Sequence, residues 1–275
     1  MLAYTIYSEA GGVGKTTLAA SLATAHADHD RDVLAIDLDP QQGSLTYLLG
    51  VDAPRDDGDA DNIARHLIDR PLGPFEDIVE STEAGFDLVP NHNMLENLPN
   101  LLTRAEEMAE DLGEHFAPNE RLLKVLGDAG VMNSYDTLII DPPATAGPHL
   151  YNAIHATRSL VVPVEPTAKG MQSVEGLEDV VVHLSDSLDI EIGVLAVIPN
   201  GVGSTSDQRK YLEQIRDLGF DAPVAIADRS SLFDGCWDSQ YPPSYYVQEV
   251  RAAYDYEQET LAQLDTLADH IEEVA

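Results

Sequence analysis

Short apolar runs alternate with segments of helical spacing along most of the chain. Apolar runs, several of them rich in β-branched residues, occur at 2–7, within 32–41, and at 86–90, 135–141, 159–164 and 192–199. Helical spacing is found at 16–26, 94–112, 171–188, 207–218 and 261–275, with one or two short helices expected within 62–80 and a last short strand at 222–227. Nearly continuous apolar runs are typical of parallel strands that are buried on both faces. The pattern predicts an α/β fold with a doubly wound, mostly parallel sheet and helices on both faces.

The first strand and the first helix are joined by a glycine-rich segment that predicts a phosphate-binding loop, as in P-loop NTPases. Glycines let backbone amides curl around phosphate oxygens, and the free amides at a helix N-terminus add positive potential. We expect Lys15 to bridge the β- and γ-phosphates of ATP and the Thr16 hydroxyl to bind Mg²⁺. The predicted nucleotide-binding residues of this loop are Gly11, Gly12, Val13, Gly14, Lys15, Thr16 and Thr17. Glu9 stands where the usual pattern has glycine, so the loop is a variant.

Carboxylates follow two of the predicted strands. Asp37 and Asp39 end the second strand, and Asp141 ends the strand at 135–141. Ligands gather at the carboxyl ends of strands in open α/β sheets, which predicts that these side chains lie beside the phosphate-binding loop. Asp141 then fits a Walker B carboxylate that holds Mg²⁺ through water. Turn formation before Pro40 is the simpler alternative for Asp37 and Asp39.

Three further segments carry weaker predictions. Asn200 follows the strand at 192–199, where its amide is placed either to read the adenine edge or to form a plain turn. The acidic segment 52–61 predicts a solvated loop. Residues 228–231 are expected to cap the helix that follows them.

Composition restricts the class of protein. The chain of 275 residues fits one domain over 1–275, and its net charge of −34 comes from 49 acidic and 15 basic residues. Such a lysine-poor acidic surface predicts the cytoplasm of a halophile, where salt screens self-repulsion. A single cysteine, Cys236, excludes an internal disulfide. No apolar run reaches the ~20 residues of a membrane span, and the acidic C-terminal segment disfavours binding to an anionic membrane.

The glycine-rich loop, the strand end at 37–41 and the strand end at 139–143 together resemble the ParA/Soj family of deviant Walker A ATPases, which partition plasmids and chromosomes. The resemblance runs from about residue 2 to residue 229. It implies that Asp39 orients the attacking water, Lys15 binds phosphate and Asp141 serves the magnesium site. Asp37 is then expected to support the metal-bound waters.

The resemblance also implies an ATP-dependent homodimer, a ParB-like partner protein and non-specific DNA binding. Ala10 occupies the position of the family's cross-subunit lysine, so the dimer contact is predicted to be weak or to use another cation, with Lys169 and Arg158 as candidates. The few late basic residues, Arg209, Lys210, Arg216, Arg229 and Arg251, are as well explained by ordinary surface charge.

These observations favour a cytoplasmic ATPase that positions or segregates DNA. A nucleotide-dependent scaffold with little hydrolysis is the alternative. A membrane-associated MinD-like protein is disfavoured by the acidic C-terminal segment.

Overall fold

The computed structural model describes residues 1–51, 55–203 and 205–275, and in these ranges eight strands form one sheet. Their order across the sheet is β3-β4-β2-β5-β1-β6-β7-β8, and the paired strands are parallel except β3 and β4. The strands are β1 Leu2–Ile6, β2 Val33–Asp37, β3 Glu80–Ser81, β4 Asp87–Val89, β5 Thr137–Asp141, β6 Ser159–Val164, β7 Gly193–Val202 and β8 Ile226–Ala227. The predicted doubly wound, mostly parallel sheet is confirmed.

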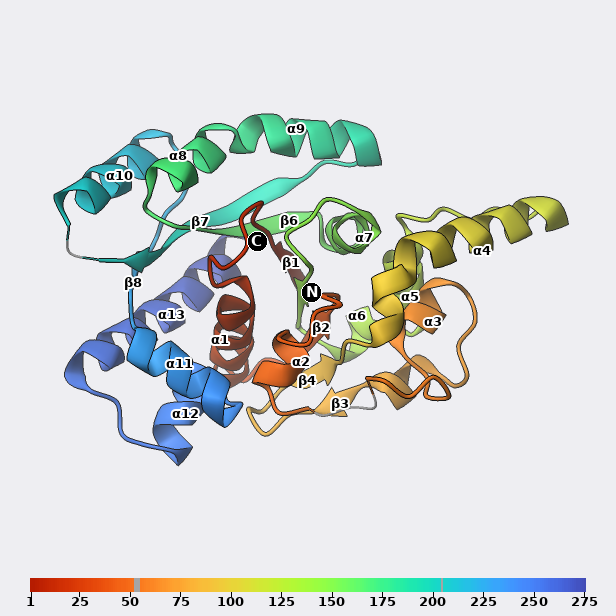
Figure 1. Ribbon diagram of the computed structural model, residues 1–275, viewed down its shortest axis with the longest axis horizontal. Helices are drawn as coiled ribbons and strands as arrows, with labels where there is room; N and C mark the ends of the chain where they lie inside the picture. The colour runs from red at the N-terminus through yellow and green to blue at the C-terminus, as the bar shows by residue number, and fades with distance from the viewer. Residues whose placement is uncertain (52–54, 204) are drawn as a thin grey trace.

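Helices cover both faces of the sheet (Figure 1). One face carries α1 Lys15–Asp28, α2 Leu45–Leu48, α11 Ser230–Ser239, α12 Pro243–Glu249 and α13 Asp255–Val274. The other carries α3 Ile63–Leu67, α4 Leu98–Leu112, α5 Arg121–Asp128, α6 Val131–Ser134, α7 Pro148–Thr157, α8 Ala168–Glu175, α9 Leu177–Leu188 and α10 Ser206–Asp217. Two 3₁₀ helices, η1 Phe75–Ile78 and η2 Asn93–Asn97, belong to the connections.

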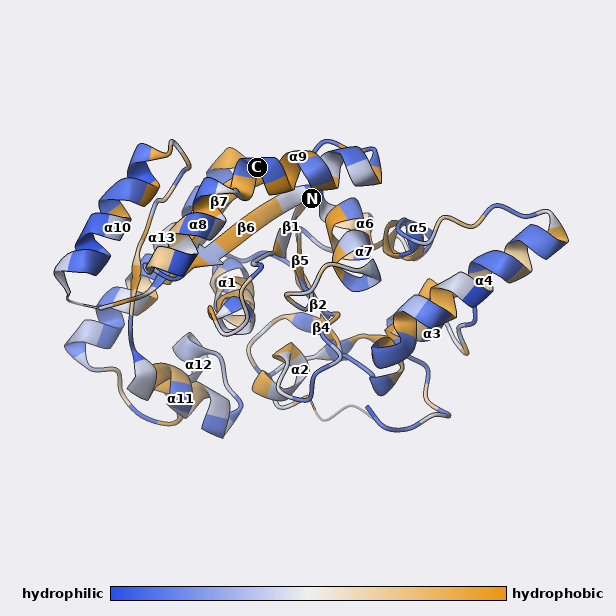
Figure 2. Ribbon diagram, turned by 45° about the horizontal axis from the view of Figure 1, so that its top comes forward, coloured by the Kyte–Doolittle hydropathy of each residue, from blue (hydrophilic) through white to orange (hydrophobic). Residues whose placement is uncertain are grey.

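Strand β1 shows why both faces need cover. Its residues Leu2, Tyr4 and Ile6 join the core beneath α1 and α13, while Ala3 packs against the opposite core. Side chains of a strand alternate between the two faces of the sheet. A strand with apolar residues on both faces is therefore stable only when helices cover both. In Figure 2 the hydrophobic strand β6 contrasts with the mostly hydrophilic helix α10 at the surface.

Several predicted elements are corrected in detail. The helix predicted at 94–112 is η2 followed by α4, because Pro99 has no backbone N–H to donate and suits the first turn of a new helix. The helix at 171–188 is divided at Gly176 into α8 and α9. The last strand is only Ile226–Ala227, shorter than the predicted 222–227, and Pro223 cannot donate to a ladder.

The predicted cap at 228–231 is confirmed in part. The N-cap residue Arg229 makes no side-chain capping bond, but Asp228 Oδ1 accepts hydrogen bonds from both the backbone N–H and the hydroxyl of Ser230, the first residue of α11. The segment 55–61 forms turns, and the rest of the predicted loop, 52–54, lies outside the described residues. Over the described part of the chain, no helix has both the length and the apolar character that crossing a bilayer requires.

Candidate active site

The phosphate-binding loop connects β1 to α1 and has the backbone that its glycines predict. Gly12 and Gly14 have φ of 80° and 86°, a left-handed conformation that glycine adopts without strain. Gly14 is the N-cap of α1, and among the described residues no side chain caps the first turn. The amides of Lys15, Thr16 and Thr17 are therefore available to a bound anion.

Asn200 holds this loop from β7. Its Nδ2 donates to the carbonyl oxygen of Val13 at 2.8 Å, and a Cβ on Gly14 would lie only 2.4 Å from the same Nδ2. Gly14 is thus required by both its φ and the close approach of Asn200. The sequence did not indicate that Asn200 positions the loop. Adenine recognition by Asn200 stays a prediction.

Asp37 is fully buried and organises the loop that follows β2. Its Oδ2 accepts hydrogen bonds from the Ser44 hydroxyl at 2.6 Å, the Thr46 amide at 2.7 Å and the Thr46 hydroxyl at 2.6 Å. Its Oδ1 accepts from the Asp39 amide at 3.0 Å. Burial raises the pKa of Asp37 to about 6, and these donors act in the opposite direction. Asp37 therefore fixes the position of Asp39, and its support of metal-bound waters stays a prediction.

Asn91 is a site residue that the sequence analysis missed. Its Nδ2 donates to the carbonyl oxygens of Asp39 and Gln41 at 2.8 and 3.0 Å, and its backbone N–H donates to the Thr46 hydroxyl. Asn91 lies just beyond β4, the neighbour of β2 in the sheet. Asp37 and Asp141 were noticed because polar residues at the carboxyl end of an apolar strand lie where ligands bind. The same rule could have identified Asn91.

Asp141 lies opposite Asp37 in the pairing of β2 with β5 and is 1% exposed. Both of its carboxylate oxygens are buried without a hydrogen-bond partner among the described residues. Burial and the neighbouring Asp37 raise the pKa of Asp141 to about 8, while the Thr16 hydroxyl and the Lys15 charge act in the opposite direction. An orphaned buried carboxylate beside a threonine hydroxyl fits a hydrated Mg²⁺, which favours one or two carboxylates and several waters.

The loop opens onto a cleft of about 700 Å³, a volume in the range of ligand sites. Lys15, Thr16, Asp39 and Asn200 line it, so the structure brings these predicted residues together. Additional walls come from α11 and its neighbours, namely Asp228, Arg229, Phe233 and Trp237. The Trp237 indole N–H donates to the Thr17 hydroxyl at 3.1 Å, a contact 220 residues apart that local sequence could not predict.

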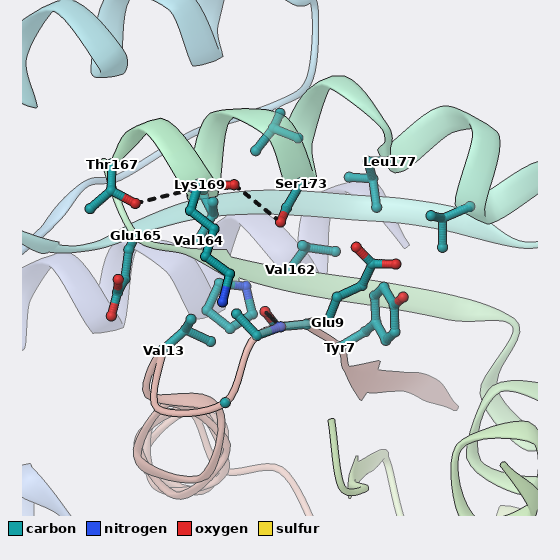
Figure 3. A pocket seen from close by; sticks show the side chains of 17 residues that line it. Tyr7, Glu9, Val13, Val162, Val164, Glu165, Thr167, Lys169, Ser173 and Leu177 are labelled. Atoms are coloured by element: carbon teal, nitrogen blue, oxygen red, sulfur yellow. Dashed lines mark hydrogen bonds between the residues drawn. The ribbon is translucent and has the colours of Figure 1, made fainter. Parts of the chain in front are cut away.

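A second, narrower pocket lies on the other side of the loop, between Glu9 and Ala10 and the start of α8. Figure 3 shows the Lys169 side chain extending from α8 toward the loop near Val13, whereas the Glu9 carboxylate lies beside Tyr7. Burial and Glu9 raise the pKa of Tyr7. Lys169 makes no ion pair with the residues that the structure describes. Arg158 lies just before the first residue of β6, whereas the phosphate-binding loop follows the carboxyl end of the parallel strand β1. Arg158 therefore cannot reach the phosphate-binding loop of the same chain.

Comparisons with known proteins agree with this geometry. A family model described as an AAA domain matches residues 2–194. The chromosome-partitioning ATPase Soj of Thermus thermophilus is 33% identical over 198 residues, which are 70% of this chain and 68% of Soj.

Two solved structures share the fold at lower identity. The ATP complex of a McdA variant from Cyanothece has a TM-score of 0.76 at 20% identity, over 100% of this chain and 97% of that one. The cell division ATPase MinD of Pyrococcus furiosus has a TM-score of 0.72 at 20% identity, over 100% of this chain and 99% of MinD.

Proposed function

The chain belongs to the family of ParA/Soj-like partition ATPases, and from this premise we propose that it binds and hydrolyses ATP and dimerises in its ATP state to position DNA or another cargo. The observation that carries the proposal is the convergence of three strand ends. Lys15 and Thr16 follow β1, Asp39 follows β2, and Asp141 ends β5, which pairs with both β1 and β2. This arrangement places the phosphate-binding loop beside two carboxylates, Asp39 at the cleft and the buried Asp141.

Each residue has a separate task in the proposed reaction. Lys15 and the first amides of α1 hold the phosphates, because they supply positive charge at the mouth of the cleft. Asp39 orients the attacking water, since its backbone is fixed from Asp37 and Asn91 while its side chain lines the cleft. Thr16 and Asp141 would hold Mg²⁺, which neutralises phosphate charge when bound.

The dimer contact needs a cation in place of the missing side chain at Ala10. We infer that Lys169 supplies it, because its side chain extends toward the loop and has no ion-pair partner among the described residues. Glu9, next to Ala10, lines the second pocket and is not among the residues that line the cleft.

The proposal is tested by measuring mass by light scattering in concentrated salt, with and without ATP and Mg²⁺. We expect the wild type to double its mass with ATP, Lys169→Ala to weaken this dimer and Ala10→Lys to strengthen it. Lys210→Ala is the matched control, because it removes an exposed lysine from α10. A wild type that stays monomeric at all ATP concentrations would refute the dimer, and equal dimerisation of Lys169→Ala and Lys210→Ala would refute the role of Lys169.

A nucleotide-dependent scaffold that hydrolyses little is the second candidate, and the absence of a lysine at position 10 favours it. Phosphate release separates the two, because a scaffold binds ATP and dimerises with little turnover even when a ParB-like partner is added.

The basic residues of the chain give limited support to DNA as the cargo. Arg251 pairs with Glu257, and Arg229 donates to the Tyr256 carbonyl and the Thr260 hydroxyl. Arg209, Lys210 and Arg216 make no ion pair within the described ranges. They share α10 with Asp207, Glu213 and Asp217, so that helix has no net charge. Contacts to DNA phosphates need an excess of basic residues. We therefore propose DNA binding that is weak and confined to low salt, in a single-domain protein adapted to a saline cytoplasm.

A further inference from the structure

The C-terminal ends of α1 and α13 meet in a cluster of histidines and carboxylates, at the end of α1 opposite the phosphate-binding loop. Glu272 Oε1 lies 2.6 Å from His26 Nδ1 and 3.1 Å from His29 Nδ1. Asp269 Oδ1 lies 3.8 Å from His29 Nδ1, and Asp265 Oδ1 lies 2.9 Å from His29 Nε2. His26 is fully buried, and its Nε2 lies 3.0 Å from the Tyr4 hydroxyl.

A neutral His29 ring cannot donate hydrogen bonds to both of the carboxylates that it faces. Both ring nitrogens of His29 face carboxylate oxygens, which accept hydrogen bonds and have none to donate. A neutral imidazole has one N–H, so one nitrogen lone pair is left facing Glu272 or Asp265. A second proton on His29 or a cation beside its Nδ1 removes this conflict.

The charges around the cluster are strongly negative. Asp28, Asp265, Asp269 and Glu272 surround it, and Arg31, 3.7 Å from Glu272, is the neighbouring permanent cation. The C-terminal ends of two helices add negative potential to that of the carboxylates. Burial lowers the pKa of His26, although its bond to Glu272 acts in the opposite direction. The neutral imidazole is the form that binds metals.

From this geometry we propose that His26, His29 and Glu272 bind a divalent transition metal ion such as Zn²⁺, with Asp269 as the nearest fourth ligand. One ligand atom from each of the first three residues lies within 4.8 Å of the others. A tetrahedral ion with ligands at 2.0–2.2 Å spaces its ligand atoms about 3.3 Å apart, so the contacts at 2.6, 3.1 and 3.8 Å need only small shifts.

The surroundings already orient both imidazoles for this role. With its proton on Nε2, His26 donates to the Tyr4 hydroxyl and turns the Nδ1 lone pair toward Glu272. His29 donates from Nε2 to Asp265 in the same way. A carboxylate or hydroxyl that accepts from the second ring nitrogen is the usual support of a metal-binding histidine. Two imidazoles select Zn²⁺, Co²⁺ or Ni²⁺ over Mg²⁺.

The site is tested by calorimetric titration of Zn²⁺ into chelator-treated full-length protein at pH 7.5, without nucleotide or Mg²⁺. We expect one tight site that excess Mg²⁺ does not displace, and an affinity at least about 100-fold weaker in His29→Ala. His270→Ala is the matched control, since His270 lies on α13, as Glu272 does, but pairs with Asp221 outside the cluster. Zn²⁺ should also raise the melting temperature of the wild type and of His270→Ala, but not that of His29→Ala.

Equal Zn²⁺ affinity in His29→Ala and the wild type would overturn the proposal, because binding would then occur elsewhere, for example at Asp141. It would also be overturned if Zn²⁺ left the melting temperature unchanged at pH 7.5 while acidification to pH 5.5 stabilised the wild type more than His29→Ala. The cluster would then be held by a protonated His29, whose pKa is lowered by burial but raised further by its bonds to Asp265 and Glu272.

Discussion

Lys15 carries the main side-chain charge that the phosphate-binding loop offers to a nucleotide. Lys15→Ala removes a charge-assisted contact, and such contacts contribute about 1.5–3 kcal/mol, so we expect ATP affinity to fall roughly 10- to 100-fold. Equilibrium dialysis with labelled ATP measures this change. Lys210→Ala, which removes an exposed lysine from α10, should bind ATP like the wild type. Unchanged affinity in Lys15→Ala would disprove the assignment of the loop.

Asp37 and Asp141 look alike in the sequence, since each ends an apolar strand, but the structure gives them different surroundings. Asp37 is satisfied by donors from Ser44, Thr46 and Asp39, whereas the Asp141 oxygens lack partners among the described residues. Ser44 and Thr46 follow Asp37 by seven and nine residues and belong to the N-cap and first turn of the short helix α2. Strand periodicity says nothing about such contacts, so the sequence could not rank the two carboxylates.

This difference predicts opposite effects on folding in the absence of ligands. Asp37→Ala leaves several buried donors unpaired and should lower the free energy of unfolding by at least about 3 kcal/mol. Asp141→Ala removes a buried carboxyl that no described residue pairs, and should leave stability unchanged or raise it. Urea unfolding at neutral pH, without nucleotide or Mg²⁺, compares the two variants. A larger loss for Asp141→Ala would mean that Asp141 is a structural residue.

Among the elements, α13 is anchored at its start by an ion pair between the half-buried Arg251 and the buried Glu257. Arg251 donates to both carboxylate oxygens of Glu257 at 2.7 Å, and the Tyr254 amide donates to Oε2 at 2.9 Å. The bonds from Arg251 lower the pKa of Glu257 below its ordinary value of 4.5, although burial opposes them. The sequence predicted a helix at 261–275 from its periodicity, but not its first six residues, 255–260, which include Glu257 of this pair.

The lowered pKa gives a defined pH dependence. Glu257 binds fewer protons in the folded than in the unfolded state, so its contribution is present above about pH 4.5 and is lost as pH falls through the folded pKa. Glu257→Gln should reduce the free energy of unfolding by about 1.5–3 kcal/mol at pH 7, and by much less in strong acid. Denaturation at several pH values measures this, with Glu259→Gln on the exposed side of α13 as the control. A loss that does not change with pH would exclude the charge of Glu257 as its cause.

The sequence was most informative about elements whose pattern is continuous. Each of the six apolar runs contains a strand, and the phosphate-binding loop and its carboxylates lie at the carboxyl ends of the strands as predicted. The sequence analysis did not predict five helices, α2, α5, α6, α7 and α12, because short helices lack enough turns for a clear period. The edge strand β3 has only two residues, both exposed, and carries no apolar signal.

At the scale of the whole molecule, the net charge of −34 opposes the proposed binding of DNA. Repulsion from DNA is screened in concentrated salt, but the phosphate contacts themselves weaken as a power of salt concentration. We predict weak binding of non-specific DNA by the ATP state at low salt and none at molar salt, measured by fluorescence anisotropy. The triple variant Arg209→Ala, Lys210→Ala, Arg216→Ala should lose the low-salt binding. Tight binding at molar salt would show that contacts other than counterion release dominate.

The central claim is that the cleft hydrolyses ATP with Asp39 as the residue that orients the attacking water. The direct measurement is ATP affinity together with steady-state phosphate release, for the wild type and Asp39→Ala in concentrated salt with Mg²⁺. Positioning of water acts mainly in the transition state, so the account predicts that Asp39→Ala keeps its ATP affinity within about threefold and loses at least about 100-fold in turnover. If affinity and turnover fell together, or if turnover persisted, Asp39 would not have the proposed role.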